Sequence, residues 1–261
     1  MAERGRPSFR LAGLGVLVAL LCLWELASRT GYVYEVYFPP ITRIAGTFLR
    51  ILLDGTLVQH MLATLGRFGR GYLLAAALAV SAGLVLGYWR LLFTFFEPLI
   101  EFMRPMPSPA IIPIAILLFG IGDEMKIFVT LYACSWPILL NTIDGVRSID
   151  RTLFNTALTF GLGRWELIRK VVIPAASPQI VTGLRISLAI ALILVTTAEM
   201  VVSNDGLGFF ILDEQRSFRI AEMYAGIFTL ALLGYTLNRV FLALDARVMG
   251  WHRGLTKKEI L

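Results

Sequence analysis

Of the 261 residues, 57% are apolar and 16% are charged, whereas an ordinary soluble domain has about 25% charged residues. This composition argues against a soluble enzyme and excludes intrinsic disorder. The 24 basic residues exceed the 18 acidic ones, which gives a formal net charge of +6. In so apolar a chain this excess is typical of cytoplasmic loops and of contact with lipid headgroups, rather than of nucleic-acid binding.

Six apolar runs predict membrane-spanning helices, each of which needs about 20 mostly apolar residues. In chain order they are 11–27, 71–89, 97–119, 127–143, 179–203 and 223–244. Basic residues precede the first run, as in a signal peptide, but no small-residue cleavage site follows it, so we expect an uncleaved helix. Between the first two runs, residues 42–54 predict an amphipathic helix at the outer interface of the membrane, with Thr42 as its N-cap.

The six spans place the two ends of the chain on one side of the membrane. With cytoplasmic termini, thirteen Lys and Arg residues fall in cytoplasmic segments and eight in outer segments. Because basic loop residues favour the cytoplasmic side, both termini are expected in the cytoplasm. The outer count includes Arg67 and Arg70, since the second span is expected to begin only at Gly71.

Residue types needed for catalysis or metal binding are scarce. The chain has no G-x-x-x-x-G-K-[ST] phosphate-binding loop, so we expect no ATP hydrolysis by this chain itself. Cys22 and Cys134 lie far apart in apolar runs and predict neither a disulfide framework nor a metal pair. His60 and His252 are expected near opposite membrane faces, which excludes a shared metal and a Ser/His/Asp triad. We therefore predict no catalytic residue, no metal site and no cofactor bound by this chain.

The polar segment 147–178, between the fourth and fifth spans, is longer than the usual helix connection of about 2–8 residues and has a helical pattern. Gly161 and Gly163 are expected to divide this 147–178 loop into two short helices that form a bent knuckle. The small side chain of Ala157 permits close approach of another surface, and Pro174 is expected to end the helix before the fifth span. The alternative is an ordinary interfacial connector.

The spacing of residues in the 147–178 loop resembles that of a known family. In order, the motif reads Asn155-Thr156-Ala157, three residues, Gly161, nine residues, then Val171-x-Ile173-Pro174. It resembles the E-A-A-x3-G-x9-I-x-L-P loop of permease subunits of binding-protein-dependent ABC importers, with Asn155 and Thr156 departing from Glu and Ala. Other stretches resemble the nitrate, sulfonate and taurine branch of that family: Phe96–Pro107, Phe119–Gly122, Thr182-Gly-Leu-Arg185, Ala198-Glu199 and Gly206-Leu-Gly208.

This resemblance covers residues 57–245 and implies an all-α integral membrane protein with six transmembrane helices, in the type I ABC importer permease fold. It divides the chain into an N-terminal segment, 1–56, a permease core, 57–245, and a basic cytoplasmic tail, 246–261. It places the protein in the bacterial cytoplasmic (inner) membrane. Through the branch, it implies a small anion or organic sulfonate as the substrate (taurine, an alkanesulfonate, nitrate or bicarbonate), with a thiamine-precursor pyrimidine as an alternative.

The resemblance also implies partners. They are a second copy of the chain, two cytoplasmic ATPase subunits that bind ATP and Mg, a periplasmic or extracellular substrate-binding protein, and membrane lipid, with no nucleic acid. The 147–178 loop would dock on the ATPase as the coupling helix. The residues expected there are Asn155, Thr156, Ala157, Phe160, Gly161, Gly163, Arg164, Trp165 and Pro174.

Polar and proline residues inside the spans are candidates for the translocation path or its gate. They are Arg104, Pro105, Ser108, Asn141, Thr197 and Glu199. Prolines from 105 to 113 predict a bent third span that lines the path. A charged side chain at the bilayer centre costs at least about 2.5 kcal/mol, so Glu199 needs a role. Since a carboxylate would repel an anionic substrate, we expect it at a gate or as a structural partner of a neighbouring helix.

Two other classes of protein remain open. A secondary transporter without an ATPase would need acidic residues at broken helices near the midplane. Glu199 stands nearly alone in this respect, and Arg185, 14 residues away, is about 21 Å distant along the helix and cannot pair with it. The other class is a scaffold or a membrane enzyme without transport activity. Co-purification of an ATPase, followed by ATP-driven transport, separates the importer from both.

Overall fold

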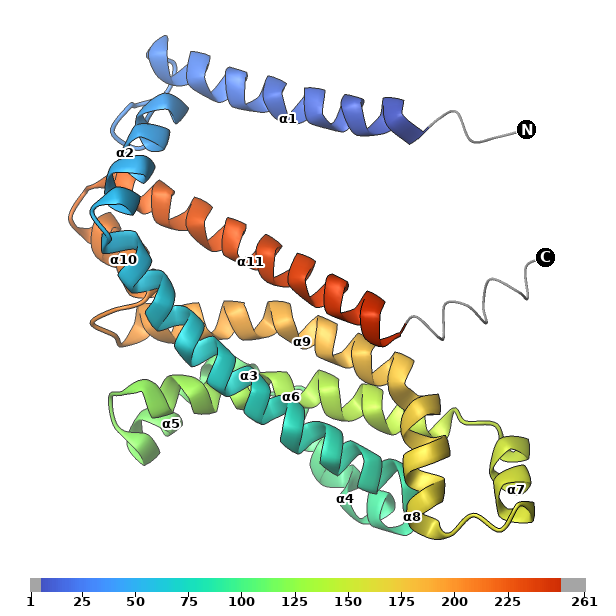
Figure 1. The fold of residues 1–261 in the computed structure, drawn as a ribbon. Coiled ribbons are helices and arrows are strands. Elements are labelled where there is room, and N and C mark those ends of the chain that lie inside the picture. The colour runs from blue at the N-terminus through green and yellow to red at the C-terminus, as the bar shows by residue number, and fades with distance from the viewer. Residues whose placement is uncertain (1–5, 250–261) are drawn as a thin grey trace.

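The structure, a computed structural model of the chain, describes residues 6–249. Within this range every regular element is a helix: α1 (Arg6–Arg29), α2 (Ile41–Leu53), α3 (Thr56–Tyr88), α4 (Arg90–Met103), η1 (Ser108–Ile111), α5 (Ile112–Phe119), α6 (Asp123–Arg147), α7 (Arg151–Thr159), α8 (Arg164–Leu167), η2 (Ile168–Val172), α9 (Ile173–Val201), α10 (Leu207–Arg216) and α11 (Ile220–Val248). Figure 1 shows the start of α1, the end of α11 and helices α7 and α8 at one end of the molecule, and α5 and α10 at the other.

Four helices are long and apolar enough to cross a membrane: α3, α6, the continuous helix Arg164–Val201, and Ile220–Arg247 of α11. A fifth candidate is bent, since α4 and the η1–α5 segment pass the same test together but meet at 91°. Helix α1 has 24 residues, or about 36 Å, and contains the whole of the first predicted span, 11–27. The all-α membrane fold is confirmed, while the exact count of six spans stays a prediction.

Helix α6 forms the centre of the bundle, and both α3 and α9 pack along its length. Glycines permit these close approaches. A Cβ at Gly83 of α3 would lie 2.6 Å from Cβ of Thr142 on α6. A Cβ at Gly183 of α9 would lie 2.9 Å from the carbonyl oxygen of Pro137 on α6. Because protein interiors are close-packed, a larger side chain at either position would push the helices apart.

Helix α3 begins earlier than predicted, at Thr56 rather than at Gly71. The helix continues beyond the apolar run because Phe68 and other side chains in its first turns are still buried on one face. Arg67 and Arg70 therefore lie on the spanning helix α3 itself and not in a segment that precedes it, so the predicted start at Gly71 is wrong. Arg67 is the central cation of the candidate functional site.

The predicted N-cap of α2 is also wrong. Its N-cap residue is Pro40, and Thr42 lies in the first turn, where its hydroxyl donates to Glu25 Oε1 of α1 at 2.8 Å. The helix itself is confirmed, but its apolar face is partly covered by the protein, because Ile44 and Ile51 are buried. Helix α2 packs against α11 and α3.

The predicted bend in the third span is confirmed. Helix α4 ends at Met103, and the chain turns by 91° before η1 and α5. The hydroxyl of Tyr132 on α6 donates to the carbonyl oxygen of Met103 at 3.1 Å. The same carbonyl also accepts the N–H of Met106 at 3.2 Å, so backbone and a neighbouring helix together satisfy this group at the break, as a membrane environment requires.

Candidate functional site

Glu199 of α9 is completely buried and joins three helices. Its carboxylate accepts hydrogen bonds from Arg67 Nη1 and Thr64 Oγ1 of α3, each at 2.9 Å. The backbone N–H of Gly208, at the start of α10, donates to the same carboxylate at 3.0 Å. Glu199 therefore fastens α9 to α3 and α10 inside the protein.

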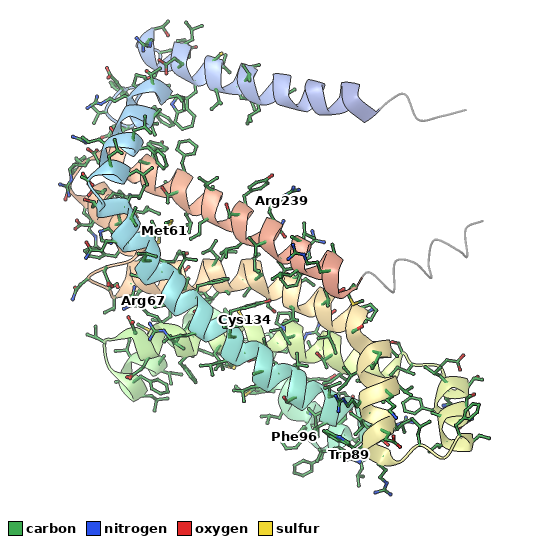
Figure 2. All side chains as sticks on the ribbon, viewed as in Figure 1. Met61, Arg67, Trp89, Phe96, Cys134 and Arg239 are labelled. Atoms are coloured by element: carbon green, nitrogen blue, oxygen red, sulfur yellow. The ribbon has the colours of Figure 1, made fainter. Side chains whose placement is uncertain are left out.

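Arg67 of α3, labelled in Figure 2, is buried as well, and it pairs with three carboxylates. Besides Glu199, its Nε donates to Asp123 Oδ1 at 2.6 Å, and its Nη2 pairs with the side chain of Asp205. Arg70, one turn later on α3, pairs with Asp123 at 2.9 Å. One guanidinium therefore holds the first residue of α6 and the loop between α9 and α10 against α3.

We call these five residues the charge cluster: Arg67, Arg70, Asp123, Glu199 and Asp205. Two cationic and three anionic groups give it a formal charge of −1. Lys126 of α6 is buried and interacts electrostatically with members of the cluster, which brings the formal sum to zero. Arg67 and Glu199 are buried, whereas Arg70, Asp123 and Asp205 are partly exposed. Since an uncompensated buried charge costs several kcal/mol, this neutrality allows the Arg67–Glu199 pair to lie inside a helical bundle.

Two glycines let the loop after α9 close onto Glu199. Gly206 has a φ of +100°, and a Cβ there would lie 2.3 Å from Cδ of Glu199. A Cβ at Gly208 would lie 2.2 Å from the carbonyl oxygen of Thr196. The N–H of Gly206 also donates to His60 Nδ1 of α3 at 3.1 Å. Gly206 packs against the Glu199 carboxylate and Gly208 against the Thr196 carbonyl, which explains why glycine stands at both ends of this Gly-Leu-Gly motif.

The charge cluster lies where α6 begins and α9 ends, at the end of the bundle opposite to α7 and α8 (Figure 1). Of the two roles open for Glu199, its geometry favours the structural partner of a neighbouring helix. The sequence-based prediction misses the cation that pairs with Glu199, because it places Arg67 ahead of the second span and not on α3. The signal for this was present in the sequence, since Arg67 lies one helical turn before Gly71 with the apolar Phe68 between them.

The 147–178 loop breaks at Gly161, as predicted, but only its first piece, α7, is a separate short helix. The second piece, from Arg164, is the start of the long helix that runs to Val201, so the prediction of two short helices is half wrong. The carboxylate of Asp150, the N-cap of α7, accepts the N–H of Thr152 at 2.8 Å, and this hydrogen bond lowers the pKa of Asp150. Helix α7 ends in a Schellman motif, in which Gly161 has a φ of +74° and the N–H of Leu162 donates to the Ala157 carbonyl at 3.2 Å. Glycine adopts this left-handed conformation without strain.

The surface of the 147–178 loop is rich in exposed aromatic and polar groups. Phe160 is 80% exposed and Trp165 is 73% exposed. The other exposed residues of the predicted contact are Asn155, Thr156, Gly161, Gly163 and Arg164. Ala157 is buried within the chain itself, so the prediction that it offers a close approach to another surface is wrong.

Pro174 does not end the helix, contrary to the prediction. The helix runs without interruption from Arg164 to Val201. Proline has no N–H to donate to the preceding turn, and that turn, Ile168–Val172, is a π-helix. A wider turn of this kind is a known local adjustment by which a helix accommodates proline.

The remaining path candidates do not form one site. Three of them lie in or beside the turn after α4: Arg104, Pro105 and Ser108. The Asn141 amide donates to the Pro137 carbonyl at 2.8 Å, where α9 packs closely on α6, so it belongs to a helix contact. Thr197 lines a groove between α9 and α11. Over residues 6–249, no three His, Cys, Asp or Glu side chains are placed to hold a metal ion.

Residues 71–250 match the protein family described as "Binding-protein-dependent transport system inner membrane component". The chain is 34% identical to the bicarbonate transport system permease protein of Synechococcus elongatus, over 88% of this chain and 86% of the relative. It is 28% identical to the taurine transport system permease protein of Escherichia coli, over 92% of this chain and 89% of the relative.

Among solved structures, the chain is similar to a chain of the MetNI methionine ABC transporter in an inward-facing conformation. The TM-score is 0.63 at 18% sequence identity, and the match covers 72% of this chain and 93% of that chain. At this identity the likeness concerns the fold, and it confirms the predicted ABC importer permease fold.

Proposed function

The chain belongs to the family of inner membrane components of binding-protein-dependent transport systems, and on that premise we propose that it imports a small anion in an ATP-driven complex. It is a membrane-spanning permease subunit of an ABC importer. The proposal concerns the chemistry of its substrate and the partners that it contacts at either end of the bundle.

The names of the relatives support an anionic substrate. One relative is named for bicarbonate and the other for taurine, which carries a sulfonate. Both groups are compact oxyanions with a delocalised charge. We propose that this chain transports a substrate of that class, a small sulfonate or a bicarbonate-like anion.

The observation that carries the coupling role is the 147–178 loop. It lies at one end of the bundle with α7 capped by Asp150 (Figure 1), and it exposes Phe160 and Trp165. Large exposed aromatic side chains are typical of contact surfaces. We propose that one ATPase subunit docks on this loop in each of two copies of the chain, so that ATP and Mg are bound by the partner and no cofactor by this chain.

The sides of the membrane follow from this docking. With the 147–178 loop in the cytoplasm, the start of α1 and the end of α11 also lie on the cytoplasmic side, because they occupy the same end of the molecule (Figure 1). The substrate-binding protein would then deliver its ligand at the other end, beside the charge cluster. The spanning part of α11 is only 11% buried, which leaves a face for a second copy and for lipid.

Co-purification and uptake test the docking. Phe160→Ala should weaken association with the cognate ATPase at least about tenfold, as expected for an aromatic anchor worth about 2 kcal/mol, and should abolish ATP-driven uptake into proteoliposomes. Phe218→Ala is the matched control, since Phe218 is 70% exposed at the opposite end of the bundle. Ala157 is unsuitable for this test because it is buried.

Two results would overturn the proposal. Full retention of the ATPase by Phe160→Ala would remove the loop as the docking surface. Uptake of the substrate without any ATPase, driven by an ion gradient, would identify a secondary transporter. The structure already disfavours a secondary transporter, because the Glu199 carboxylate accepts hydrogen bonds from Arg67 and Thr64.

A further inference from the structure

Arg185 lies on an exposed face of α9, near the middle of the helix. The continuous helix runs from Arg164 to Val201. Arg185 is 21 residues from its first residue and 16 from its last, so it stands about 32 Å from one end and about 24 Å from the other. Within residues 6–249, Arg185 makes no hydrogen bond or ion pair. An arginine at this depth in a spanning helix is costly and marks a path for ions or substrate, or a partner.

A groove between α9 and α11 contains the Arg185 side chain. Its volume is about 540 Å³, within the range of about 300–1,000 Å³ that is usual for small-molecule sites. Most of its lining is apolar. The polar side chains that line it are Arg185, Thr196, Thr197, Tyr235 and Asn238.

The polar groups in this groove suit an oxyanion. The guanidinium of Arg185 presents a planar fork of N–H donors that binds carboxylate-like groups through two parallel hydrogen bonds. Asn238 and Tyr235 of α11 can add donors from the facing wall. No Asp or Glu lines the groove, so its only charged side chain is a cation without a protein partner.

We propose that Arg185 binds the transported anion in this groove during its passage. This inference rests on the proposed function, because it names the place on the path where the imported anion is held. The occupant is a small sulfonate or bicarbonate-like anion. A lipid headgroup does not fit, since phosphates lie at the membrane surface and Arg185 lies near the middle of a spanning helix.

The charge cluster supports this assignment indirectly. Glu199 lies 14 residues after Arg185 on the same helix, about 21 Å along the axis. An ionised Glu199 facing the path would repel an approaching anion. Because Glu199 is enclosed and paired with Arg67, its charge is compensated and the groove keeps the positive potential of Arg185.

The test measures that potential directly in the assembled complex. Ala189 lines the same groove, one turn after Arg185, and Ala189→Cys is introduced into a Cys22→Ser chain, because Cys22 is exposed whereas Cys134 is buried. The new thiol is labelled with an anionic ethylsulfonate or a cationic trimethylammonium methanethiosulfonate. Arg185→Gln should lower the anionic-to-cationic rate ratio about tenfold, and Arg185→Lys should preserve most of it.

Arg239 provides the matched control. It is an exposed arginine on the neighbouring helix α11 (Figure 2) and is not part of the groove lining, so Arg239→Gln should leave the ratio unchanged. Taurine or bicarbonate, whichever the complex transports, should slow labelling of the new thiol when Arg185 is present and not in Arg185→Gln.

An unchanged ratio in Arg185→Gln, or an equal loss in Arg239→Gln, would overturn the inference. This failure is distinct from failure of the proposed function, which is read from ATPase co-purification and ATP-driven uptake by the chain with native Arg185. A complex that transports an anion but shows no effect of Arg185 on labelling would refute the anion site alone.

Discussion

Replacing Arg67 by methionine keeps most of the side-chain length but leaves the Glu199 carboxylate buried without its cation. Thr64 and the N–H of Gly208 still donate to that carboxylate. Breaking a buried ion pair by removal of one partner costs about 3–5 kcal/mol. At about 2–4 °C per kcal/mol for chains of this size, we expect the Tm of Arg67→Met to fall by about 6–20 °C.

The same reasoning predicts non-additivity. Glu199→Gln should cost only about 1–3 kcal/mol, because Arg67 keeps Asp123 and Asp205 as partners. The double variant R67M/E199Q leaves no buried charge at position 199, so it should be more stable than the sum of the two losses by at least about 1 kcal/mol. Arg70→Met is the control, since an exposed ion pair contributes about 0–1 kcal/mol.

Thermal unfolding of the purified chains, followed by intrinsic fluorescence under one set of detergent conditions, measures the whole cycle. Additive losses from the two single variants would show that Arg67 and Glu199 do not stabilise one another. A loss in Arg70→Met as large as that in Arg67→Met would show that general surface charge, and not the buried pair, sets the stability. Either result refutes the reasoning.

Two further predictions concern single backbone positions. Gly208→Ala should prevent accumulation of folded protein in size-exclusion chromatography, since its Cβ would lie 2.2 Å from the Thr196 carbonyl oxygen, whereas Gly122→Ala, with open space around its Cβ, should be tolerated. The hydrogen bond from the Thr152 N–H lowers the pKa of Asp150. The ionised cap therefore stabilises α7 fully at a pH above the ordinary aspartate pKa, and this stabilisation disappears as the pH falls through the lowered pKa. Protection of the α7 amides from hydrogen exchange should therefore drop in strong acid. Asp150→Asn, which keeps a hydrogen-bond acceptor, should lack this drop. Constant protection of α7 in the native chain would contradict the role of the ionised cap.

The spanning helices could be predicted because their signal is continuous. The predicted runs 127–143 and 223–244 lie inside α6 and α11. Their ends could not be located, because hydropathy stops where polar residues begin while a helix continues as long as one face stays buried. Arg67 was misplaced for this reason. When the start of α3 shifts from Gly71 to Thr56, Arg67 moves from the segment before the helix to the interior of the protein.

The 147–178 loop and the charge cluster differ in how much the sequence reveals. The knuckle depends on local rules, because Gly161 supplies a left-handed residue and ends α7 wherever the rest of the chain lies. The cluster depends on tertiary contacts between residues far apart in the chain: Arg67 and Asp205 are 138 positions apart. No spacing rule joins them, and only the packing of α3, α6 and α9 brings these charges together.

The helix from Arg164 to Val201 connects all three functional features. Its 38 residues extend about 57 Å, with Trp165 in the first turn, Arg185 near the middle and Glu199 near the end. Because Glu199 is bonded to α3 and α10, that end cannot slide independently of its neighbours. If the 147–178 loop moves with a docked ATPase, as we propose, the helix would either bend at the π-turn or tilt about the charge cluster, and a tilt would change the width of the groove at Arg185. In the proposed importer, the buried pair of Arg67 and Glu199 would therefore serve as the fixed point about which this helix moves.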